Sequence, residues 1–449
     1  MKKIAIIGGG IAGLSAAYHL QQQFGGQVSL TVLEKNDYIG GHTCTIDVVD
    51  PDGVPLAIDT GFMVFNKRTY PQFTPFLDQL GIAYQPADMS FSLQHRALNL
   101  EWNGAGFNKI FAQRRNLFNL RFWRMLLQLD RFNREAKQAA ERGELETSMG
   151  ELSLGDYIAQ RGYSEDFKTL FLMPMGSAIW SATFAQMQAF PARTLMRFFD
   201  NHGFLGLHEH HQWYTVIGGA RQYVRALQGQ GSIQFNTGCT MQKVVRQGHQ
   251  VQLEFASGER QTFDAVILAT HADDALALLD APTALEQALL SAFAYQPNEA
   301  ILHTDASVMP QRKRCWAAWN YRLDADASAS ASASASGGAY KTSTHYWVSH
   351  LQSLKTRTPH FVSIEGGHLI APEKRLKTLA FKHPVFSVQA AKAQTELATL
   401  NAQEHAASQD GDMRQRVFFC GSYFKYGFHE DAFTAGKQAA AALAQAWEP

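Results

Sequence analysis

The sequence predicts an α/β protein in which a parallel sheet is built from distant parts of the chain and an α+β domain is inserted between them. Residues 3–7 (KIAII) are a short, continuously apolar run, which is typical of a strand buried on both faces. Similar runs end at Thr270 and at Gly421, and each leads into a loop. All three runs have the pattern of a buried strand followed by a loop, so we expect them to share one sheet. The segments between them differ in composition and are expected to form a second domain.

Charge and cysteine content exclude several classes of protein. Lysine plus arginine and aspartate plus glutamate both total 40, so the net charge gives no reason to expect a nucleic acid partner. The 449 residues suffice for two or three domains. The four cysteines are far apart and form no CxxC pair, which indicates reduced thiols of a cytoplasmic protein. We expect neither a disulfide frame nor a bound metal.

Apolar segments of the chain are short. No uncharged apolar stretch reaches the roughly 18–20 residues that cross a bilayer. The first 20 residues pair two lysines with an apolar run, as signal peptides do, but no small-residue cleavage site follows. We therefore expect a cytoplasmic protein, with peripheral contact at a membrane as the alternative.

A glycine-rich loop follows the first apolar run and opens a helix. Gly8, Gly10 and Gly13 have the spacing GxGxxG, which permits a tight turn and lets backbone N–H groups approach a pyrophosphate. Glu34 ends the next apolar run, 21 residues after Gly13, where a carboxylate holds the hydroxyl groups of a ribose. Strand, loop, helix and acid together indicate a Rossmann-like domain that binds a dinucleotide.

Six further segments follow one another along nearly the whole chain. They are EKNDYIGGHT (34–43), IDTGFMVF (58–65), IGGARQYVRAL (217–227), TGCTMQKVVRQGHQVQLEF (237–255), FDAVILAT (263–270) and VFFCGS with GFHEDAFTAGKQAA (417–440). With the glycine-rich loop, they resemble the FAD-dependent amine oxidase superfamily. The resemblance implies an FAD-binding domain of the two-dinucleotide-binding-domain type, with an inserted substrate domain.

Four shorter segments resemble a bacterial branch of that superfamily. They are FPARTLMRFFDNHGFL (190–205), WNY (319–321), HPVF (383–386) and GFHED (427–431). The branch consists of predicted FAD-dependent oxidoreductases, often linked to cyclopropane-fatty-acyl-lipid synthesis. This resemblance identifies relatives but says little about the chemistry.

The resemblance also implies which residues contact FAD. The expected set is Gly8, Gly10, Ile11, Ala12, Gly13, Glu34, Lys35, Gly41, His42, Thr43, Gly61, Phe62, Met63, Val244, Gly421, Ser422, Asp431 and Ala432. His42 stands where many relatives have arginine, so a positive charge there depends on protonation. Ser422 stands where many have a carboxylate. No cysteine or histidine matches a site of covalent attachment, so we expect non-covalent FAD.

The last helix is expected to begin near Asp431 with its N-terminus directed at the flavin. Its free N–H groups and the positive end of its dipole would stabilise negative charge on the reduced ring. By the resemblance, Phe428 faces the substrate side. His429 and Glu430 are the candidate acid or base, although Glu430 capping the helix and His429 simply packing are equally ordinary roles.

The domain division follows from these motifs. The FAD-binding domain is expected to comprise residues 1–85, 205–280 and 380–449, and the substrate domain residues 86–204 and 281–379. Residues 324–339, rich in alanine and serine, are expected to form a flexible loop at the tip of a hairpin.

Two other groups have alternative interpretations. His208, His210 and His211 lack a partner motif and are expected to lie on a solvated loop rather than bind metal. Residues 111–135 mix six arginines with large apolar side chains. This pattern suits a helix at a membrane surface, but we favour an ordinary amphipathic helix whose packed face is marked by Phe118, Phe122, Met125, Leu126 and Leu129.

The sequence therefore predicts an FAD-dependent oxidoreductase that takes a hydride from a C–H bond onto flavin N5. The branch and the aromatic-rich second domain, with Trp180, Trp213, Trp316, Trp319 and Trp347 as candidate lining residues, favour an apolar substrate such as a lipid or acyl chain. An amine is the second choice. Chemistry without net redox, as in UDP-galactopyranose mutases, and a structural flavoprotein are further alternatives. The oligomeric state is left open.

Overall fold

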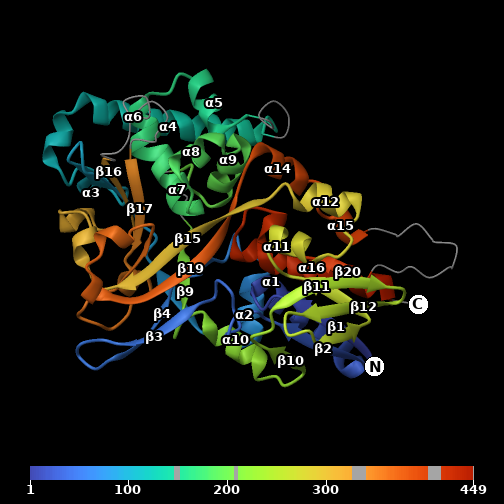
Figure 1. Ribbon diagram of the computed structural model, residues 1–449. Helices are drawn as coiled ribbons and strands as arrows, with labels where there is room; N and C mark the ends of the chain where they lie inside the picture. Colours follow the sequence, from blue (N-terminus) through green and yellow to red (C-terminus); the bar gives the residue numbers. More distant parts are fainter. Residues whose placement is uncertain (146–151, 207–210, 326–339, 403–415, 448–449) are drawn as a thin grey trace.

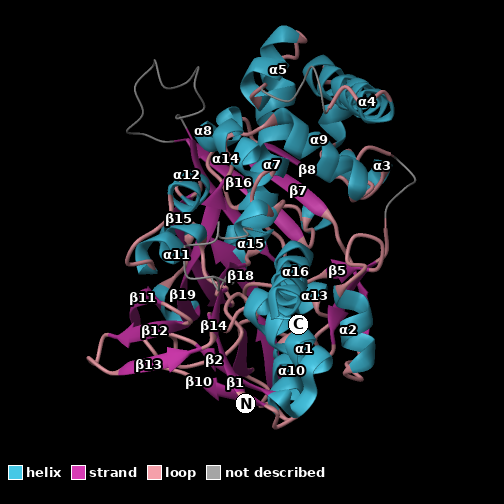
Figure 2. Cartoon of the chain, turned by 90° about the vertical axis from the view of Figure 1, so that its right-hand side faces the viewer, coloured by secondary structure: helices cyan, strands magenta, loops and turns pink. Residues whose placement is uncertain are grey.

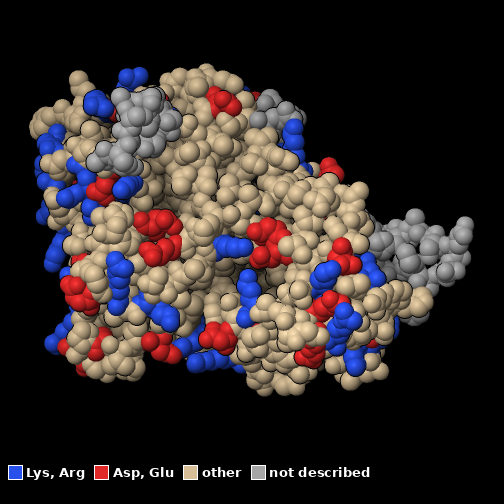
Figure 3. Space-filling model, viewed as in Figure 1, with Lys and Arg blue, Asp and Glu red and all other residues tan. Residues whose placement is uncertain are grey.

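The structure is a computed structural model that describes residues 1–145, 152–206, 211–325, 340–402 and 416–447 (Figure 1). A group of helices lies at one end of the molecule, and the first strand and last helix lie together at the other. Lys and Arg side chains are interspersed with Asp and Glu over the face drawn in Figure 3, in keeping with the zero net charge.

A five-stranded parallel sheet combines strands from both ends and the middle of the chain. Its order is β10-β2-β1-β14-β20. The strands are β1 (Lys2–Ile7), β2 (Val28–Leu33), β10 (Ile233–Asn236), β14 (Ala265–Leu268) and β20 (Val417–Phe419). The pairing of β1 with β14 and of β14 with β20 confirms that the three apolar runs share one sheet.

The apolar run of β1 is continuous because both faces of this sheet are covered. Ile4 and Ile6 join a core with α1 (Ile11–Phe24) and α16 (His429–Trp447). Ala5 and Ile7 join a second core with a three-stranded antiparallel sheet, β11 (Met241–Gln247), β12 (Gln250–Phe255) and β13 (Arg260–Phe263). Alternate side chains of one strand thus stabilise two different layers.

The first and last helices pack directly on each other, as Figure 2 shows for α1 and α16. The hydroxyl of Ser15 donates to the carbonyl oxygen of Phe433 at 2.6 Å. A Cβ on Gly436 would overlap the carbonyl oxygen of Ala12, so only glycine permits this close approach. The contact brings the glycine-rich loop and the start of α16 to the same edge of the sheet.

A second sheet of seven strands has the order β19-β15-β18-β17-β16-β7-β8. Its strands are β7 (Phe91–His95), β8 (Leu100–Asn103), β15 (Ala294–His303), β16 (Trp319–Ala325), β17 (Tyr340–Tyr346), β18 (Phe361–Ile364) and β19 (Arg375–Val385). Within the described part of this sheet, β16 and β7 alone pair in parallel. A core of aromatic and aliphatic side chains joins this sheet to the helical group.

The helical group comprises seven α-helices in the described ranges. They are α3 (Phe107–Ile110), α4 (Leu120–Glu141), α5 (Leu154–Gln160), α6 (Glu165–Phe167), α7 (Met173–Trp180), α8 (Phe184–Ala189) and α9 (Ala192–Asn201). In Figure 2, α4, α5 and α9 lie above the strands β7, β8 and β16 of the second sheet, and α3 lies beside β7 and β8.

The remaining elements connect the two sheets. The strands are β3 (Thr45–Val49), β4 (Pro55–Asp59), β5 (Phe65–Asn66), β6 (Tyr84–Ala87) and β9 (Trp213–Val216). The helices are α2 (Phe73–Gln79), α10 (Arg221–Gln228), α11 (Ala272–Leu278), α12 (Ala284–Leu290), α13 (Val348–Leu351), α14 (Val388–Gln394) and α15 (Thr399–Ala402).

Two of the expected domain boundaries fall inside strands. The boundary after residue 85 divides β6, which pairs with β9. The boundary after residue 379 divides β19, which continues to Val385 as an edge strand of the second sheet. The composition of a segment does not show where a strand begins and ends, so it could not predict that β6 and β19 cross these boundaries. The rest of the domain division stays a prediction.

The alanine–serine segment lies between two strands that pair as a hairpin. β16 and β17 are antiparallel and in register from Trp319–Tyr346 to Ala325–Tyr340. Residues 324 and 325 belong to β16, and residues 326–339 lie outside the described part of the chain, as do His208 and His210.

Residues 111–135 do not form one helix. A short 3₁₀ turn, η2 (Arg114–Phe118), precedes α4, and the side chain of Asn119 caps α4 by accepting from Arg121 and Phe122 N–H groups. Phe122 and Met125 are buried as expected, but Phe118 is 89% exposed, so its place on the packed face is wrong. Among the described residues, no helix is both long and apolar enough to cross a membrane.

Candidate flavin site

The glycine-rich loop lies between β1 and α1, at the carboxyl edge of the parallel sheet, where Rossmann-like folds bind dinucleotides. Gly8 has φ +108°, and a Cβ there would lie 2.5 Å from the carbonyl oxygen of Ala269. A Cβ on Gly13 would overlap the carbonyl oxygen of Gly8. At Gly10, by contrast, no atom lies within 4 Å of the Cβ position. The open space beside Gly10 and the start of α1 fits a pyrophosphate.

Glu34 follows β2, and its buried carboxylate lies beside this loop. Oε2 accepts from the N–H of Gly9 at 2.7 Å, and Oε1 accepts from the backbone and side-chain nitrogens of Asn36 at 2.9 and 2.8 Å. A carboxylate has about four acceptor positions, so Glu34 can still accept from a ribose hydroxyl. The neighbouring Lys35 is 63% exposed and lies 3.8 Å from Asp274, and its contact with FAD stays a prediction.

A second loop folds back onto the first. Gly40 forms a parallel bridge with Gly10, and Gly41 has φ +58°, with its Cβ position 3.2 Å from Gly10 Cα. The Nε2 atom of His42 is buried and has no hydrogen-bond partner among the described residues. Burial, followed by the charge of His271, lowers the pKa of His42 to about 4. His42 thus differs from an arginine, whose positive charge persists in a buried site.

His42 belongs to a group of three histidines that no motif of the sequence predicts. His271 follows β14 and His383 lies in β19, with ring centroids 6.4 and 5.3 Å from that of His42. Phe381 stacks on His42 at 4.9 Å. Burial lowers the pKa of His271 to about 4 and that of His383 to about 3. Because these residues are far apart in the chain, no spacing marks them as a group.

Acidic residues beside His271 form ion pairs. Ligand atoms of His271, Asp273 and Asp274 lie within 4.8 Å of one another, which is close enough for a metal. Lys382, however, lies 3.6 Å from Asp273 and 3.4 Å from Asp274. The lysine occupies the place that a cation would take, so we interpret the group as an ion-pair cluster.

The segment around Asp59 joins three of the motifs. The carboxylate of Asp59 is 1% exposed and accepts from the N–H of Ala220 at 2.9 Å and from the hydroxyl of Thr45 at 2.5 Å. Two residues later, a Cβ on Gly61 would overlap the carbonyl oxygen of His42. The IDTG, GGHT and IGGA segments therefore meet at one point, although they are far apart in the sequence.

His429, the first residue of α16, is buried among these segments. Its ring stacks on that of Phe62, with centroids 3.7 Å apart. Its Nε2 lies 2.9 Å from the hydroxyl of Tyr223, which also bonds to the hydroxyl of Thr43. Burial lowers the pKa of His429 well below its usual value, so the imidazole is neutral. These contacts suit a packed connecting residue, and a catalytic role stays a prediction.

The two carboxylates that follow act as helix caps. Glu430 accepts from the N–H groups of Gln72 at 2.9 Å and Phe73 at 3.0 Å, at the start of α2. Asp431 accepts from the N–H of Phe428 at 3.0 Å, at the start of α16. Burial raises the pKa of Glu430 to about 7 and that of Asp431 to about 6. Both oxygens of Glu430 are already engaged, so its geometry favours capping over proton transfer.

Phe428 lies in an aromatic group supplied by the helical domain. Its ring centroid is 4.7 Å from that of Phe198 in α9 and 5.8 Å from that of Trp180 in α7. The indole N–H of Trp180 donates to the carbonyl oxygen of Tyr426 at 3.1 Å. Of the candidate lining residues, Trp180 is thus placed beside Phe428.

Other candidate tryptophans lie elsewhere. Trp316 and Trp347 pack edge to face at 5.2 Å, next to a separate small core around Phe361. Trp319 packs edge to face against Tyr346. These three side chains therefore take part in the packing of the second sheet.

The remaining expected FAD contacts are placed but not tested. Val244 lies in β11, and its carbonyl oxygen accepts from the N–H of Asp280 at 3.2 Å. The Cβ position of Gly421 lies 3.2 Å from the carbonyl oxygen of Thr270, so β14 and β20 end side by side. Ser422 opens the next turn, and Met63 and Ala432 are buried. Their contacts with FAD stay predictions.

A cleft of about 830 Å³ lies beside the start of α16. Phe428, Glu430 and Asp431 form one wall, residues 68–72 a second, and the end of α9 a third. Lys137 of α4 also reaches it. Of the aromatic group, the cleft thus reaches Phe428.

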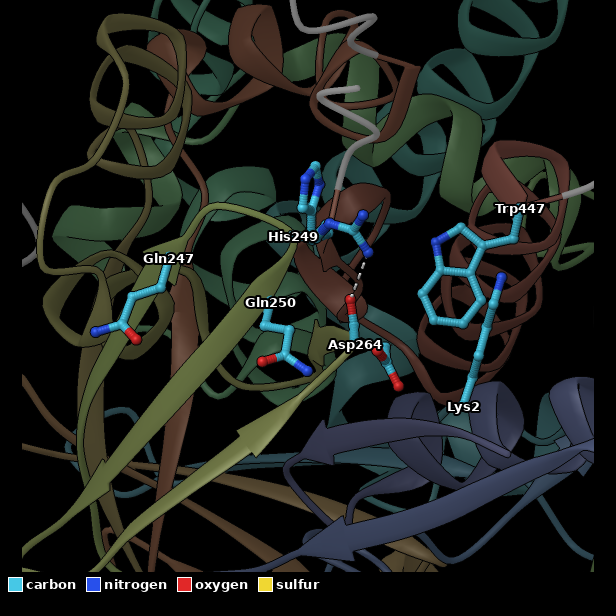
Figure 4. A pocket seen from close by; sticks show the side chains of 7 residues that line it. Lys2, Gln247, His249, Gln250, Asp264 and Trp447 are labelled. Carbon is cyan, nitrogen blue, oxygen red and sulfur yellow. Dashed lines mark hydrogen bonds between the residues drawn. The ribbon is translucent and has the colours of Figure 1, made fainter. Parts of the chain in front are cut away.

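A second hollow, of about 540 Å³, lies at the other end of the parallel sheet (Figure 4). It is lined by Lys2, Asp264, Arg416 and Trp447, and Arg416 donates to the carbonyl oxygen of Asp264 at 3.1 Å. Lys2 and the glycine-rich loop are at opposite ends of β1, so this hollow is not part of the flavin site.

Solved structures with the same fold are flavoenzymes of several kinds. Cyclohexylamine oxidase from Brevibacterium oxydans IH-35A is 15% identical, with a TM-score of 0.65 and 99% of each chain covered. Putrescine oxidase is 13% identical, with a TM-score of 0.64 and 99% of each chain covered. A CLA-producing fatty acid isomerase from P. acnes is 13% identical, with a TM-score of 0.63 and 97% of each chain covered. At such identity the likeness shows the fold alone.

Curated relatives match over short segments. Prenylcysteine oxidase 1 of Bos taurus is 51% identical over 47 residues, which are 10% of this chain and 9% of that protein. The protein of the same name from Rattus norvegicus is 35% identical over 86 residues, 19% of this chain and 16% of that protein. The aligned segments thus span less than a fifth of either relative.

The fold and the site define the class of the protein as an FAD-dependent oxidoreductase, with an open space at Gly10 and a buried acid at Glu34 that suit the cofactor. The model of the flavin containing amine oxidoreductase family matches residues 11–352, and the chain belongs to this family. The cofactor, fold class and enzyme class expected from the sequence are confirmed.

Proposed function

We propose that the chain removes a hydride from a C–H bond of an apolar substrate, a lipid or acyl chain, with FAD bound non-covalently. The observation that carries this proposal is the aromatic group beside the start of α16. Phe428 lines the cleft and is backed by the buried rings of Phe198 and Trp180, and we call these three side chains the aromatic wall. By the resemblance to the family, Phe428 faces the substrate side of the flavin. Two similar proteins are also named for apolar chains, a fatty acid and a prenylcysteine.

Bound FAD supplies the hydride acceptor. The protein binds and orients the substrate and the cofactor, and it polarises the flavin ring. The first N–H groups of α16 have no acceptor within the helix, and the positive end of its dipole stabilises negative charge close to that terminus. Glu430 and Asp431 hold that end of the helix by capping α2 and α16.

An amine is the second candidate substrate because the cleft carries acids. Asp200, Glu430 and Asp431 line it, together with Arg68, Lys137 and Lys425, and the carboxylates attract an ammonium group. Cyclohexylamine oxidase and putrescine oxidase, which share the fold, are named for amines. The aromatic wall and the carboxylates of the cleft thus favour different substrates, which one experiment distinguishes.

The test is an absorbance spectrum of the purified protein followed by anaerobic mixing with fatty acyl lipids and with amines. We expect the flavin band to bleach with a lipid and to recover when air is admitted. Bleaching by amines but not by lipids would indicate that the substrate is an amine. No bleaching by either, combined with activity on a nucleotide sugar only after chemical reduction, would favour a mutase-like reaction. A flavin that accepts no electrons at all would indicate a structural role.

A pair of variants tests the aromatic wall. Phe428→Ala is expected to slow bleaching by lipid about fivefold while FAD content is unchanged, because one aromatic contact contributes roughly 1 kcal/mol. Leu376→Ala, at an exposed apolar residue of β19 that does not line the cleft, is the control and should bleach at the normal rate. Equal rates for both variants would contradict the role given to Phe428.

A further inference from the structure

Exposed apolar side chains gather at one place on the helical domain. Twelve large hydrophobic residues of the described chain are exposed, and five of them fall within residues 107–127. They are Phe107 (61%), Phe118 (89%), Leu120 (84%), Trp123 (37%) and Leu127 (67%). Single exposed apolar residues need no explanation, but a cluster of this size marks a surface that contacts something. We call it the α3–α4 surface.

Two parts of the α3–α4 surface pack on one buried ring, that of Phe111. The ring of Phe111 lies 4.7 Å from that of Phe107 and 5.0 Å from that of Trp123, which joins α3 to α4. Along α4, Leu120, Trp123 and Leu127 are spaced i, i+3 and i+7 and so share one face. The opposite face holds buried residues such as Phe122, so α4 is apolar on both sides.

The same segment is strongly basic. Residues 102–129 contain no aspartate or glutamate and five basic residues, Lys109, Arg114, Arg115, Arg121 and Arg124. Arg121 is paired with Asp166. Arg114, Arg115 and Arg124 form no ion pair among the described residues. In Figure 3 blue side chains gather along the upper left edge, where Figure 1 places α3.

We propose that the α3–α4 surface docks the protein onto an anionic lipid bilayer. Apolar side chains that point outward between arginines without acidic partners match the boundary between acyl chains and anionic headgroups, which takes up both kinds of group. A second copy of this chain suits the surface less well, because its five cations would meet the same cations of the partner in a two-fold contact.

Docking occurs away from the catalytic cleft. The α3–α4 surface ends at Leu127 in α4, whereas Lys137, which reaches the cleft, is ten residues later and so about 15 Å along the helix axis. Substitutions on this surface therefore leave Phe428 and its neighbours untouched. Membrane binding and oxidation of a soluble substrate can be lost independently.

The experiment measures sedimentation of the FAD-loaded protein with sucrose-filled vesicles. We expect binding to mixed phosphatidylcholine–phosphatidylglycerol vesicles and much weaker binding to pure phosphatidylcholine or at high salt. The triple variant Phe118→Ser, Leu120→Ser, Leu127→Ser is expected to bind the mixed vesicles at least about tenfold more weakly than the unaltered protein. Arg115→Gln with Arg124→Gln is also expected to lose at least tenfold, since each cation near an anionic surface contributes about fivefold.

Matched controls carry equivalent changes on other faces. Val49→Ser with Leu376→Ser replaces two exposed apolar residues, and Lys243→Gln with Arg260→Gln removes two exposed cations. Both controls should bind as the unaltered protein does. Unchanged vesicle binding by the triple variant would overturn the proposal, as would equal binding to both vesicle types. A dimer that the triple variant converts to monomer, without vesicle binding, would assign the surface to a second copy instead.

Discussion

Individual glycines of the first loop meet different physical constraints, although the motif presents them as equivalent. Gly8 has a positive φ and Gly13 lies against the carbonyl oxygen of Gly8. Both are needed by the fold itself. Gly10 has open space at its Cβ position, and its φ of −74° is available to any residue. Only Gly10 is therefore required by the ligand.

This difference gives a prediction. Gly10→Val should leave the apoprotein folded and remove FAD, because the side chain fills the space for the pyrophosphate. Gly13→Ala should lower the free energy of unfolding of the apoprotein itself. Gly26→Ala, at an exposed site with no atom within 4 Å of the Cβ position, is the control and should change neither property. FAD content and urea unfolding measure the two effects, and normal FAD content in Gly10→Val would refute the placement.

Glu430 illustrates how a buried cap titrates. Its pKa is raised to about 7 by burial, against an ordinary value of 4.5, while the N–H groups of Gln72 and Phe73 oppose the shift. The folded state thus binds the proton more tightly than the unfolded chain does. The stability that this proton contributes is complete below about pH 4.5 and is lost as the pH rises through about 7.

The comparison with Glu430→Gln tests this linkage. The free energy of unfolding of the unaltered protein minus that of the variant should decrease between about pH 4.5 and pH 7, by at most about 3 kcal/mol. Urea unfolding of both apoproteins across this range measures it. A difference that stays constant, or that grows with pH, would show that Glu430 remains ionised in the fold.

At the scale of elements, the contact of α1 with α16 connects the two ends of the chain. Sequence periodicity indicates both helices but not their pairing. The pairing depends on Gly436, where a Cβ would overlap the carbonyl oxygen of Ala12. It brings His429 at the start of α16 to the segments that carry Thr43 and Phe62.

Gly436→Ala is accordingly expected to destabilise the protein by about 1–3 kcal/mol, because α16 must move away from α1. Ala441→Ser, on the exposed side of the same helix, should change stability by less than about 0.5 kcal/mol. Urea unfolding of the apoproteins is the measurement. Equal stability of the two variants would mean that the helices do not pack as described.

The segment 111–135 shows where element assignment from sequence fails. Its aromatic and arginine residues have helical spacing, yet Asn119 starts a new helix and separates Phe118 from the packed face. A cap takes effect through backbone N–H groups, and periodicity does not contain that information. Burial of one face of α4 was predictable, whereas the exposure of a second apolar face was not.

For the whole molecule, the flavin site is formed by segments that no single part of the chain supplies. β1, β14 and β20 end at the same sheet edge, and the loops after them carry Gly10, His271 and Gly421. A ligand that contacts all three segments stabilises the folded chain as a unit, because the unfolded chain cannot bind it.

The melting temperature should therefore rise with the concentration of free FAD. At about 100 times the dissociation constant, the expected stabilisation is about 2.7 kcal/mol. Gly10→Val should show no such rise over the same FAD concentrations, whereas Gly26→Ala should behave like the unaltered protein. A melting temperature that is independent of FAD would contradict a binding site assembled from distant segments.

By itself, the sequence determined the nucleotide-binding strand, loop and helix, the cofactor, and the order of the family motifs. The strand, loop and helix are local features, since they depend on strand burial, on the backbone freedom of glycine and on short spacings. Glu34 and Gly10 were predictable for that reason. The cofactor follows instead from the resemblance that the family motifs carry by their order along the chain.

Only the tertiary structure decided what each polar side chain contacts. Glu430 and Asp431 are caps, His429 is a buried link to Tyr223, and His42 is a member of a histidine group. The sequence leaves capping for Glu430 and packing for His429 as alternatives to catalysis, and it does not identify their partners, because Gln72, Phe73 and Tyr223 lie hundreds of residues away. The protonation states follow from burial, which exists only once the distant segments have packed together.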